Sequence, residues 1–496
     1  MKKKLSFSAI AIAVLALSNI AFAEETTAQP VVVDEAEALA MDAKIYAESY
    51  GVSYDEALER LTVMLYGENT VETAASSEGS DLAGRYYDNG ADFGLVVKTK
   101  SPQSNKTISF TPKLKENYGR LNSQAKRERN EARKKLREQF SLSDAQISKA
   151  ENALSTPKQL KVKYQKSEVT LSDLNTAIEV LSKNGSSVEG YNLAFIDERE
   201  SSINVILDRE VSPSAQAKLR KLVKVPVTFE VIPGGMQPVA NMRGGSKLYA
   251  NSNPTNTSSR YCMSSFGAKH NTAKTSSGGA ITGLVTAAHC TQISHIIGDD
   301  GKVYPLTTGA TLDDRGSTNR ADLRFVYNAN NNPIGVGQFY FNGTSEVRNV
   351  TGTRTRLSTA VGGGTPDKVM GTTPGSFVCH LGQTSYGSAN SIQSCGEVIS
   401  VTAAQSSAGQ APSQSNGYFV MIRNTQSGAG TVRTSGVGTL RCYQGDSGGP
   451  VFAGTVAFGV VSACGWTTTV NTDPTRYLMY TSTDYFNNLG VSILVP

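Results

Sequence analysis

Three short segments carry residue types that together could activate a serine hydroxyl. His289 lies in the segment TAAHC after an apolar run, Asp322 starts another apolar segment, and Ser447 lies in the glycine-rich segment GDSGGP. A serine hydroxyl is a weak nucleophile, so it needs a base, and histidine has a pKa that suits proton transfer near neutral pH. That base in turn needs a buried carboxylate to fix its tautomer. The glycines beside Ser447 would let backbone N–H groups turn toward a developing oxyanion.

Other acidic residues compete for the carboxylate position. Asp313 and Asp314 lie in a polar Asp-Asp-Arg-Gly turn, whereas Asp322 starts an apolar segment and is easier to bury. The pairs Asp299-Asp300 and Asp313-Asp314 could instead hold calcium, but acidic residues are also common in turns, and we find no zinc motif. We therefore favour Asp322 and expect neither a metal nor a cofactor.

The order of these residues and the motifs around them resemble the chymotrypsin-type serine endopeptidases. The order histidine, aspartate, serine separates that group from subtilisins and from α/β-hydrolases. The likeness covers about residues 244–496, and segments 243–249 and 378–396 are similar to the bacterial secreted branch, the alpha-lytic protease and streptogrisin type. It implies an all-β double six-stranded barrel with a C-terminal helix, preceded by an α+β region. Short β-like runs separated by glycine, serine and threonine agree with an all-β class.

The resemblance also implies roles for individual residues. Ser447 would be the nucleophile, His289 the general acid and base, and Asp322 the orienting carboxylate; the backbone N–H groups of Gly445 and Ser447 would form the oxyanion hole. Protein or peptide substrates would be hydrolysed through an acyl-enzyme. Six cysteines allow fifteen pairings, and the family pattern selects three: Cys262–Cys290, Cys379–Cys395 and Cys442–Cys464.

One departure from the family pattern lies in the middle disulfide loop. His380 stands where those bacterial enzymes usually carry arginine, and we predict a His380–Asp446 pair that supports the loop before Ser447. Such a pair would weaken as the histidine loses its proton. His295 lacks the flanks of His289 and is expected on the surface.

The predicted substrate pocket is a second departure. Its base should be Leu440, and no acidic residue stands there, so cleavage after lysine or arginine is not expected. An apolar residue before the cleaved bond is the preferred expectation. Arg441 should point to solvent or, alternatively, reach into the pocket and favour acidic residues. The pocket walls should include three further residues, Ser462, Ala463 and Gly465.

Residues 1–23 have the pattern of a secretory signal peptide. Three lysines precede an apolar run over about residues 9–21, and Ala21-Phe22-Ala23 matches a signal-peptidase site. The run is shorter than the roughly 20 residues of a membrane span, which disfavours an N-terminal anchor. We therefore expect secretion by the general secretory route, no membrane span after signal removal, and disulfides formed in an oxidising compartment.

The remaining chain divides into two parts of different composition. All six cysteines and 33 of the 46 glycines lie in residues 246–496, which hold 16 Lys and Arg and 11 Asp and Glu, against 32 and 32 in residues 1–245. The formal net charge of +5 is small and does not predict a nucleic-acid partner. Residues 31–66 have helical spacing with a cap at Ser53, 67–84 are expected to form a loop, and 158–232 are of mixed α and β pattern.

These differences predict a signal peptide at 1–23, a pro-region at 24–240 and a protease domain at 241–496. In the resembled family the pro-region catalyses folding and inhibits the enzyme, so this chain's own pro-region is an expected partner, and a monomer is expected. Residues 24–240 contain no cysteine or histidine, although they could be a retained functional domain. The alternative for the whole protein is a catalytically inactive protease-fold binding protein or adhesin.

Overall fold

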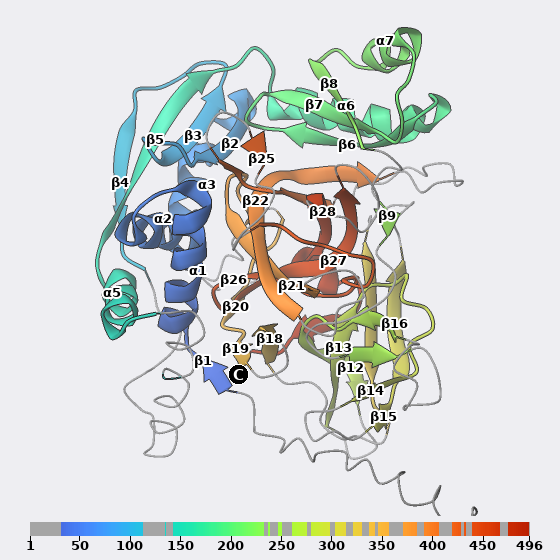
Figure 1. Ribbon diagram of the computed structural model, residues 1–496. Coiled ribbons are helices and arrows are strands. Elements are labelled where there is room, and N and C mark those ends of the chain that lie inside the picture. Colours follow the sequence, from blue (N-terminus) through green and yellow to red (C-terminus); the bar gives the residue numbers. More distant parts are fainter. Residues whose placement is uncertain are drawn as a thin grey trace, which may run out of the picture.

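The computed structural model of the protein describes most of the chain after residue 30 (Figure 1). It describes residues 31–112, 134, 142–232, 237–238, 247–249, 260–274, 279–297, 303–313, 321–329, 337–342, 346–356, 371–383, 391–405, 419–427, 431–432, 439–466 and 475–495. The predicted signal segment 1–23 and the predicted boundary at residue 240 lie outside these ranges. Within them, no helix is both long enough and apolar enough to cross a membrane.

Three helices lie near the start of the described chain: α1 (Glu35–Tyr50), α2 (Tyr54–Tyr66) and α3 (Glu68–Ser76). Asp34 and Ser53 cap the first two, each accepting a hydrogen bond from a backbone N–H three residues later. The helices predicted over 31–66 are therefore confirmed. The loop predicted for 67–84 is wrong, because that segment contains α3, whose Val71, Ala74 and Ala75 are buried.

A four-stranded sheet lies beside these helices. Its order is β2-β3-β5-β4, with strands β2 (Leu82–Asp88), β3 (Gly94–Thr99), β4 (Lys106–Phe110) and β5 (Lys158–Lys166). The short 3-10 helix η1 (Gly79–Asp81) precedes β2, and helix α5 (Asp144–Ser155) packs against α1 and α2. These helices and this sheet form the first part of the N-terminal region.

The second part of the N-terminal region is an α+β unit with its own core. It consists of α6 (Leu171–Asn184), η3 (Gly185–Ser187), β6 (Tyr191–Asp197), β7 (Ser202–Leu207), α7 (Pro213–Leu222) and β8 (Val227–Val231). Leu174, Ile178 and Val205 lie in one buried cluster, which joins helix α6 to the sheet. The hairpin predicted from the alternating residues around 194–207 is confirmed as β6 and β7.

Six strands of the C-terminal region form a closed barrel. They are β21 (Phe377–Gln383), β22 (Ser391–Gln405), β23 (Phe419–Arg423), β26 (Pro450–Ala453), β27 (Val456–Trp466) and β28 (Thr475–Ser482). The order is β21-β26-β27-β28-β23-β22, and β22 pairs with β21 to close the ring. Short strands β20 (Gly352–Thr353), β24 (Gln426–Ser427) and β25 (Thr431–Val432) lie at its margins.

Two further sheets lie in the C-terminal region, and the first contains both the strand that ends before His289 and the strand that begins at Asp322. One has the order β16-β17-β13-β12-β29, from β16 (Thr307–Asp313), β17 (Asp322–Tyr327), β13 (Ala280–Thr286), β12 (Gly267–Lys274) and β29 (Val491–Ile493). The other has the order β11-β10-β14-β15, from β11 (Arg260–Met263), β10 (Lys247–Tyr249), β14 (His295–Ile297) and β15 (Val303–Pro305). The described residues thus show one closed barrel and two open sheets where a second closed barrel was expected. The predicted C-terminal helix is a single 3-10 turn, η4 (Thr483–Phe486), because β29 follows it and pairs with β12.

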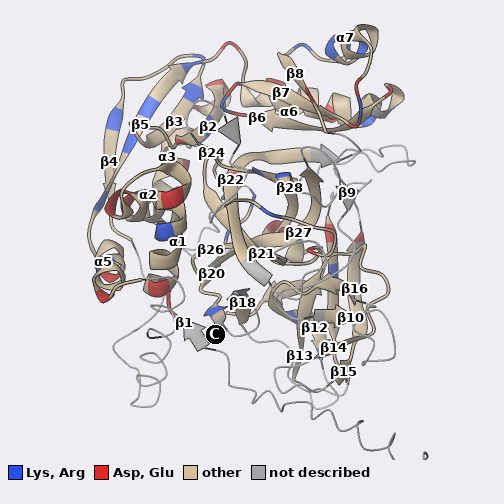
Figure 2. Cartoon of the chain, in the orientation of Figure 1, with Lys and Arg blue, Asp and Glu red and all other residues tan. Residues whose placement is uncertain are grey.

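The N-terminal region and the barrel are joined by pairing of backbone strands. Strand β6 extends the barrel sheet through β22, with Phe195 opposite Ala403. Strand β1 (Val31–Val33) pairs with β19 (Glu346–Asn349), which also pairs with β18 (Gln338–Asn342), and β9 (Gln237–Pro238) pairs with β27. One buried cluster contains side chains from α1 and from the barrel. Charged residues are concentrated on the helices and outer strands of the N-terminal region, while the barrel strands are mostly uncharged (Figure 2).

Candidate active site

The structure brings His289, Asp322 and Ser447 together. His289 follows the end of β13, Asp322 is the first residue of β17, and Ser447 lies in the turn before β26. The Nδ1 atom of His289 lies 2.6 Å from Oδ2 of Asp322, and its Nε2 atom lies 2.7 Å from Oγ of Ser447. The ring is therefore in hydrogen-bonding distance of both the hydroxyl and the carboxylate.

The Asp322 carboxylate is fully buried and receives hydrogen bonds beyond the histidine ring. The backbone N–H of His289 donates to Oδ1 at 3.0 Å, and the Ser462 hydroxyl donates to Oδ2 at 2.6 Å. The backbone N–H of Asp322 donates to Oγ1 of Thr481 at 3.2 Å. These contacts fix the carboxylate against the ring. Asp313, the other candidate for the carboxylate position, lies opposite Asp322 on β16 and is exposed. The remaining candidates Asp299, Asp300 and Asp314 lie outside the described residues.

Two glycines give the turn around Ser447 its shape. Gly445 has φ 118° and Gly448 has φ 85°, conformations that residues with a Cβ rarely adopt. A Cβ on Gly448 would also lie 2.2 Å from both the Met263 carbonyl oxygen and Oγ1 of Thr286. The turn therefore packs directly against the strand that leads to His289. The predicted oxyanion hole of Gly445 and Ser447 belongs to this turn.

The three disulfides have the predicted pairing. Cys262–Cys290 joins β11 to the residue after His289, Cys379–Cys395 joins β21 to β22, and Cys442–Cys464 joins the segment before Ser447 to β27. The described residues contain no free cysteine. Two of these bonds thus anchor segments next to the triad.

Two of the predicted pocket residues have side-chain partners in the structure, and the pocket wall itself stays a prediction. Ser462 donates its hydroxyl to Asp322, so its side chain supports the carboxylate. Ala463 is buried in a cluster with Phe195 and Tyr477, on the face of β27 that the N-terminal region covers. The register of β27 shifts between Val461 and Ala463, and the side chains of Ser462 and Ala463 have different partners. Gly465 pairs with Tyr477 on β28.

Leu440 and Arg441 lie in a buried segment beside this strand. The Leu440 side chain is fully buried, and its N–H donates to the amide oxygen of Asn424 at 3.2 Å. Arg441 is half-buried. Trp466 was not predicted from the sequence; its indole N–H donates to the Cys442 carbonyl at 2.8 Å and joins β27 to this segment. A long-range contact of this kind leaves no local pattern in a sequence.

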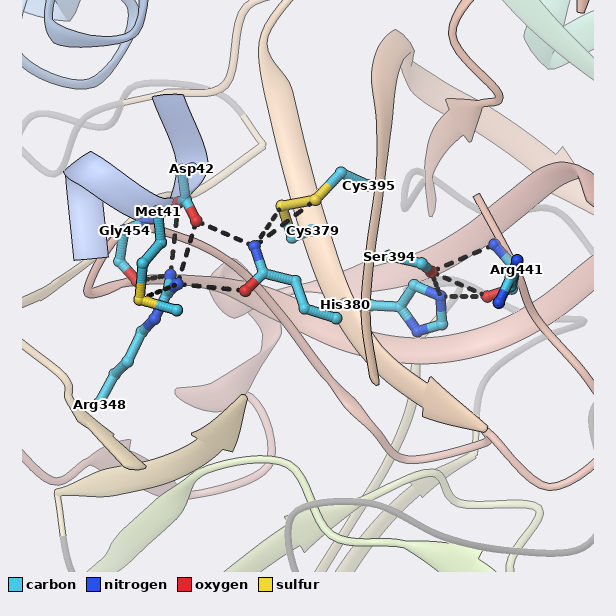
Figure 3. The surroundings of a disulfide bond; sticks show 10 residues. Met41, Asp42, Arg348, Cys379, His380, Ser394, Cys395, Arg441 and Gly454 are labelled. Atoms are coloured by element: carbon cyan, nitrogen blue, oxygen red, sulfur yellow. Dashed lines mark hydrogen bonds and ion pairs between the residues drawn. A yellow bond between two sulfur atoms is a disulfide. The ribbon is translucent and has the colours of Figure 1, made fainter. Parts of the chain in front are cut away.

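The predicted His380–Asp446 pair is not formed. The His380 ring donates from Nε2 to the Arg441 carbonyl at 2.6 Å and lies 2.9 Å from the Ser394 hydroxyl (Figure 3). Burial lowers the pKa of His380 to about 4, so the ring is neutral at physiological pH. Asp446 instead accepts a hydrogen bond from the Tyr443 N–H at 3.0 Å. His380 supports the segment around Arg441 by a neutral hydrogen bond.

His295 was expected on the surface, and this expectation is wrong. Its side chain is buried and stacks on Tyr249, with ring centroids 5.0 Å apart and planes 2° from parallel. Burial lowers the pKa of the imidazole. The residue packs β14 against β10. Among the described residues, no group of three or more histidine, cysteine, aspartate or glutamate side chains is placed to hold a metal.

Comparisons with known proteins give structural neighbours only. No protein-family model and no curated protein sequence matches the chain. A glutamic acid specific serine protease that uses a histidine triad in substrate binding is 19% identical with a TM-score of 0.30, over 50% of this chain and 98% of its own. Cellulomonas bogoriensis chymotrypsin is 17% identical with a TM-score of 0.30, over 52% and 100%. Kallikrein-related peptidase 10 with Zn²⁺ is 16% identical with a TM-score of 0.24, over 45% and 91%. These neighbours are chymotrypsin-like serine proteases.

Proposed function

We propose that the protein is a serine endopeptidase that is made as a secreted precursor. The supporting observation is the hydrogen-bonded chain from Asp322 through His289 to Ser447, with distances of 2.6 and 2.7 Å. A serine hydroxyl, an imidazole and a buried carboxylate in this order are the parts that nucleophilic acyl transfer needs. The three disulfides agree with export to an oxidising compartment.

In the proposed reaction, His289 accepts a proton from Ser447 and then donates it to the leaving amine. Oγ of Ser447 bonds to the substrate carbonyl carbon while Nε2 of His289 takes the hydroxyl proton. The C–N bond then breaks, and His289 returns that proton to the leaving amine. Water repeats the sequence on the acyl-enzyme and releases the acid. Asp322 stabilises the imidazolium that forms in each half. The backbone N–H groups of Gly445 and Ser447 are the proposed donors to the oxyanion, a contact typically worth about 3 kcal/mol.

A strand of the chain itself supports self-cleavage. Strand β9 runs antiparallel to β27, with Gln237 opposite Cys464 and Pro238 opposite Ala463. The next residue of β27 toward the triad is Ser462, which donates to Asp322. Extended peptides bind proteases and other proteins by such strand addition. We propose that the chain is cut shortly after this strand, near the boundary at residue 240 that the sequence predicts.

The proposed pro-region, residues 24–240, assists folding and inhibits the enzyme. Strand β6 continues the sheet of β22, which is 15 residues long, so the N-terminal region covers barrel backbone while the barrel forms. Barrels depend on contacts between residues far apart in sequence and therefore fold slowly. Strand β9 occupies the edge of β27 beside the triad, which supports inhibition until the chain is cut.

Labelling with a small serine-directed fluorophosphonate tests the proposed activity. We expect the secreted protein to gain the mass of one phosphonyl group on Ser447, and the Ser447→Ala and His289→Ala variants to gain none. Folded wild-type protein that takes up no label would overturn the proposal. It would favour an inactive protease-fold binding protein.

A further inference from the structure

The carboxylate of Asp42, on helix α1, lies in a complete set of hydrogen-bond donors. Its Oδ1 accepts from Nη2 of Arg348 at 3.1 Å and from Nε2 of Gln393 at 2.9 Å. Its Oδ2 accepts from the Gly454 N–H at 2.6 Å and from Nη1 of Arg348 at 3.3 Å. Figure 3 shows this arrangement beside the Cys379–Cys395 disulfide. Each carboxylate oxygen thus has two donors, one of them from the same guanidinium.

All of these donors belong to the C-terminal region. Arg348 lies on β19, Gln393 lies on β22, and Gly454 lies in the turn between β26 and β27 with φ 56°. We call these three residues the carboxylate cradle. A guanidinium that binds both oxygens of a carboxylate gives geometric selectivity as well as energy. The N-terminal region contributes only the anion.

The cradle is held in shape by bonds among its own members. Arg348 also donates to the Gly454 carbonyl at 2.9 Å and to Oε1 of Gln393 at 3.1 Å, and its guanidinium lies 5.2 Å from the centre of the Phe452 ring. The Gln393 amide also contacts the sulfur of Cys379 at 3.1 Å. These contacts orient the donors without help from α1. Arg348 is 0% and Asp42 2% exposed, so solvent hardly screens the ion pair.

A second buried pair of an acid and an arginine joins the N-terminal and C-terminal regions. Glu68, on α3, accepts a hydrogen bond from Oγ1 of Thr373 at 2.8 Å and pairs with Arg354 at 3.6 Å, and both charged side chains are buried. Here too the acid comes from the N-terminal region and the arginine from the C-terminal region. Glu68 also pairs with Arg85 of its own region at 3.5 Å, so this second contact is less selective than the cradle.

We propose that the carboxylate cradle is a binding site for the N-terminal region as a separate chain, with Asp42 as the group it recognises. This inference rests on the proposed function, because cleavage before the protease domain is what makes two chains. Before cleavage Asp42 binds within one chain. After cleavage the cradle retains the released region through the same carboxylate, and it selects that region over partners that lack an acid at this position.

The test uses the full-length chain with Ser447→Ala and a recognition sequence for an added site-specific protease inserted between residues 240 and 246. The folded protein is cut, the C-terminal fragment is immobilised, and the release rate of the N-terminal fragment is measured. Removing one partner of a buried charge pair acts mainly on dissociation. We expect Asp42→Ala to speed release by about 100-fold in sodium chloride.

Chemical rescue shows whether the cradle recognises a carboxylate. Formate matches the group that Asp42→Ala removes, so replacing chloride by formate at equal ionic strength should slow release to within about 10-fold of the parent. Asp55→Ala is the matched control, because Asp55 is exposed and pairs with Lys149 inside the N-terminal region. That variant should release at the parent rate in both salts.

Two results would overturn the proposal: release of the Asp42→Ala fragment at the parent rate, or equal rates in formate and chloride. If Asp42→Ala folds in neither salt, Asp42→Asn decides, because the amide keeps the shape but places N–H groups against donors. Release at the parent rate in that variant would then overturn the cradle. Since the added protease makes the cut, none of these outcomes depends on the chemistry of Ser447.

Discussion

At the scale of single residues, Ser462 illustrates how the triad depends on a side chain outside it. Its hydroxyl donates to Oδ2 of Asp322, the same oxygen that lies 2.6 Å from the histidine ring. Hydrogen bonds to a charged group in a buried site contribute about 1.5–3 kcal/mol. The position of the carboxylate, and through it the ring, therefore rests on β27 as well as on β17.

We expect Ser462→Ala to lower kcat by about 10-fold, since Asp322 loses a donor while Ser447 and His289 remain. The measurement is kcat and its pH dependence with a peptide that the wild-type enzyme cleaves. The matched control is Ser400→Ala, because this buried serine of the same barrel forms its hydrogen bonds with the Thr402 backbone. An unchanged kcat and pH profile in Ser462→Ala would contradict the support role.

The residues of the triad could be predicted because their neighbours are local. His289 and Ser447 are each surrounded by contiguous residues that shape the turn or the strand end. The side-chain direction of Ser462 and Ala463 could not be predicted, because it depends on which face of β27 meets Asp322. The hydrogen-bond partner of His380 could not be predicted either, since Arg441 is 61 residues away along the chain.

At the scale of elements, the turn between β6 and β7 carries a buried acid. Glu198 accepts a hydrogen bond from the Arg85 N–H at 2.7 Å, and burial raises its pKa to about 7. The folded protein therefore holds a proton on Glu198 that the unfolded chain, with an ordinary pKa of 4.5, has lost above that pH. Stability is fully present below the unfolded pKa and falls as pH rises toward 7, by about 3 kcal/mol.

Glu198→Gln should remove this pH dependence, because the amide stays neutral. We expect the variant to gain about 3 kcal/mol over its parent between pH 4.5 and pH 8, measured by denaturant unfolding of the Ser447→Ala chain. Glu200→Gln, an exposed site in the same turn, should give no such gain. Parallel stability curves for Glu198→Gln and its parent would show that the carboxyl is not protonated in the folded state.

Elements with local signals were predictable and those with distant partners were not. The cap at Ser53 and the alternation in 194–207 are local, and both elements are present. Helix α3 was missed because its small polar residues resemble a loop, and burial against β2 and β3 stabilises it. Thr483-Asp484 resembles a helix cap and predicts a C-terminal helix, but the pairing of β29 with β12 limits this segment to one 3-10 turn.

At the scale of the whole molecule, charged residues are unevenly distributed between the N-terminal region and the barrel. The charged N-terminal region surrounds one side of a barrel of low charge (Figures 1 and 2). The two are nevertheless joined by β6, by β9 and by the buried pair of Asp42 with Arg348. The sequence indicated the division, but the contacts across it could not be predicted because each joins residues far apart in the chain.

The central claim is that Ser447 cuts its own precursor beside β9. The most direct test is the intact mass and N-terminal sequence of the secreted wild-type protein and of Ser447→Ala, side by side. We expect a wild-type C-terminal fragment that begins near residue 240 and a variant chain that continues uncut from residue 24. The same cleaved fragment in Ser447→Ala, or an uncut chain in both proteins, would contradict the claim.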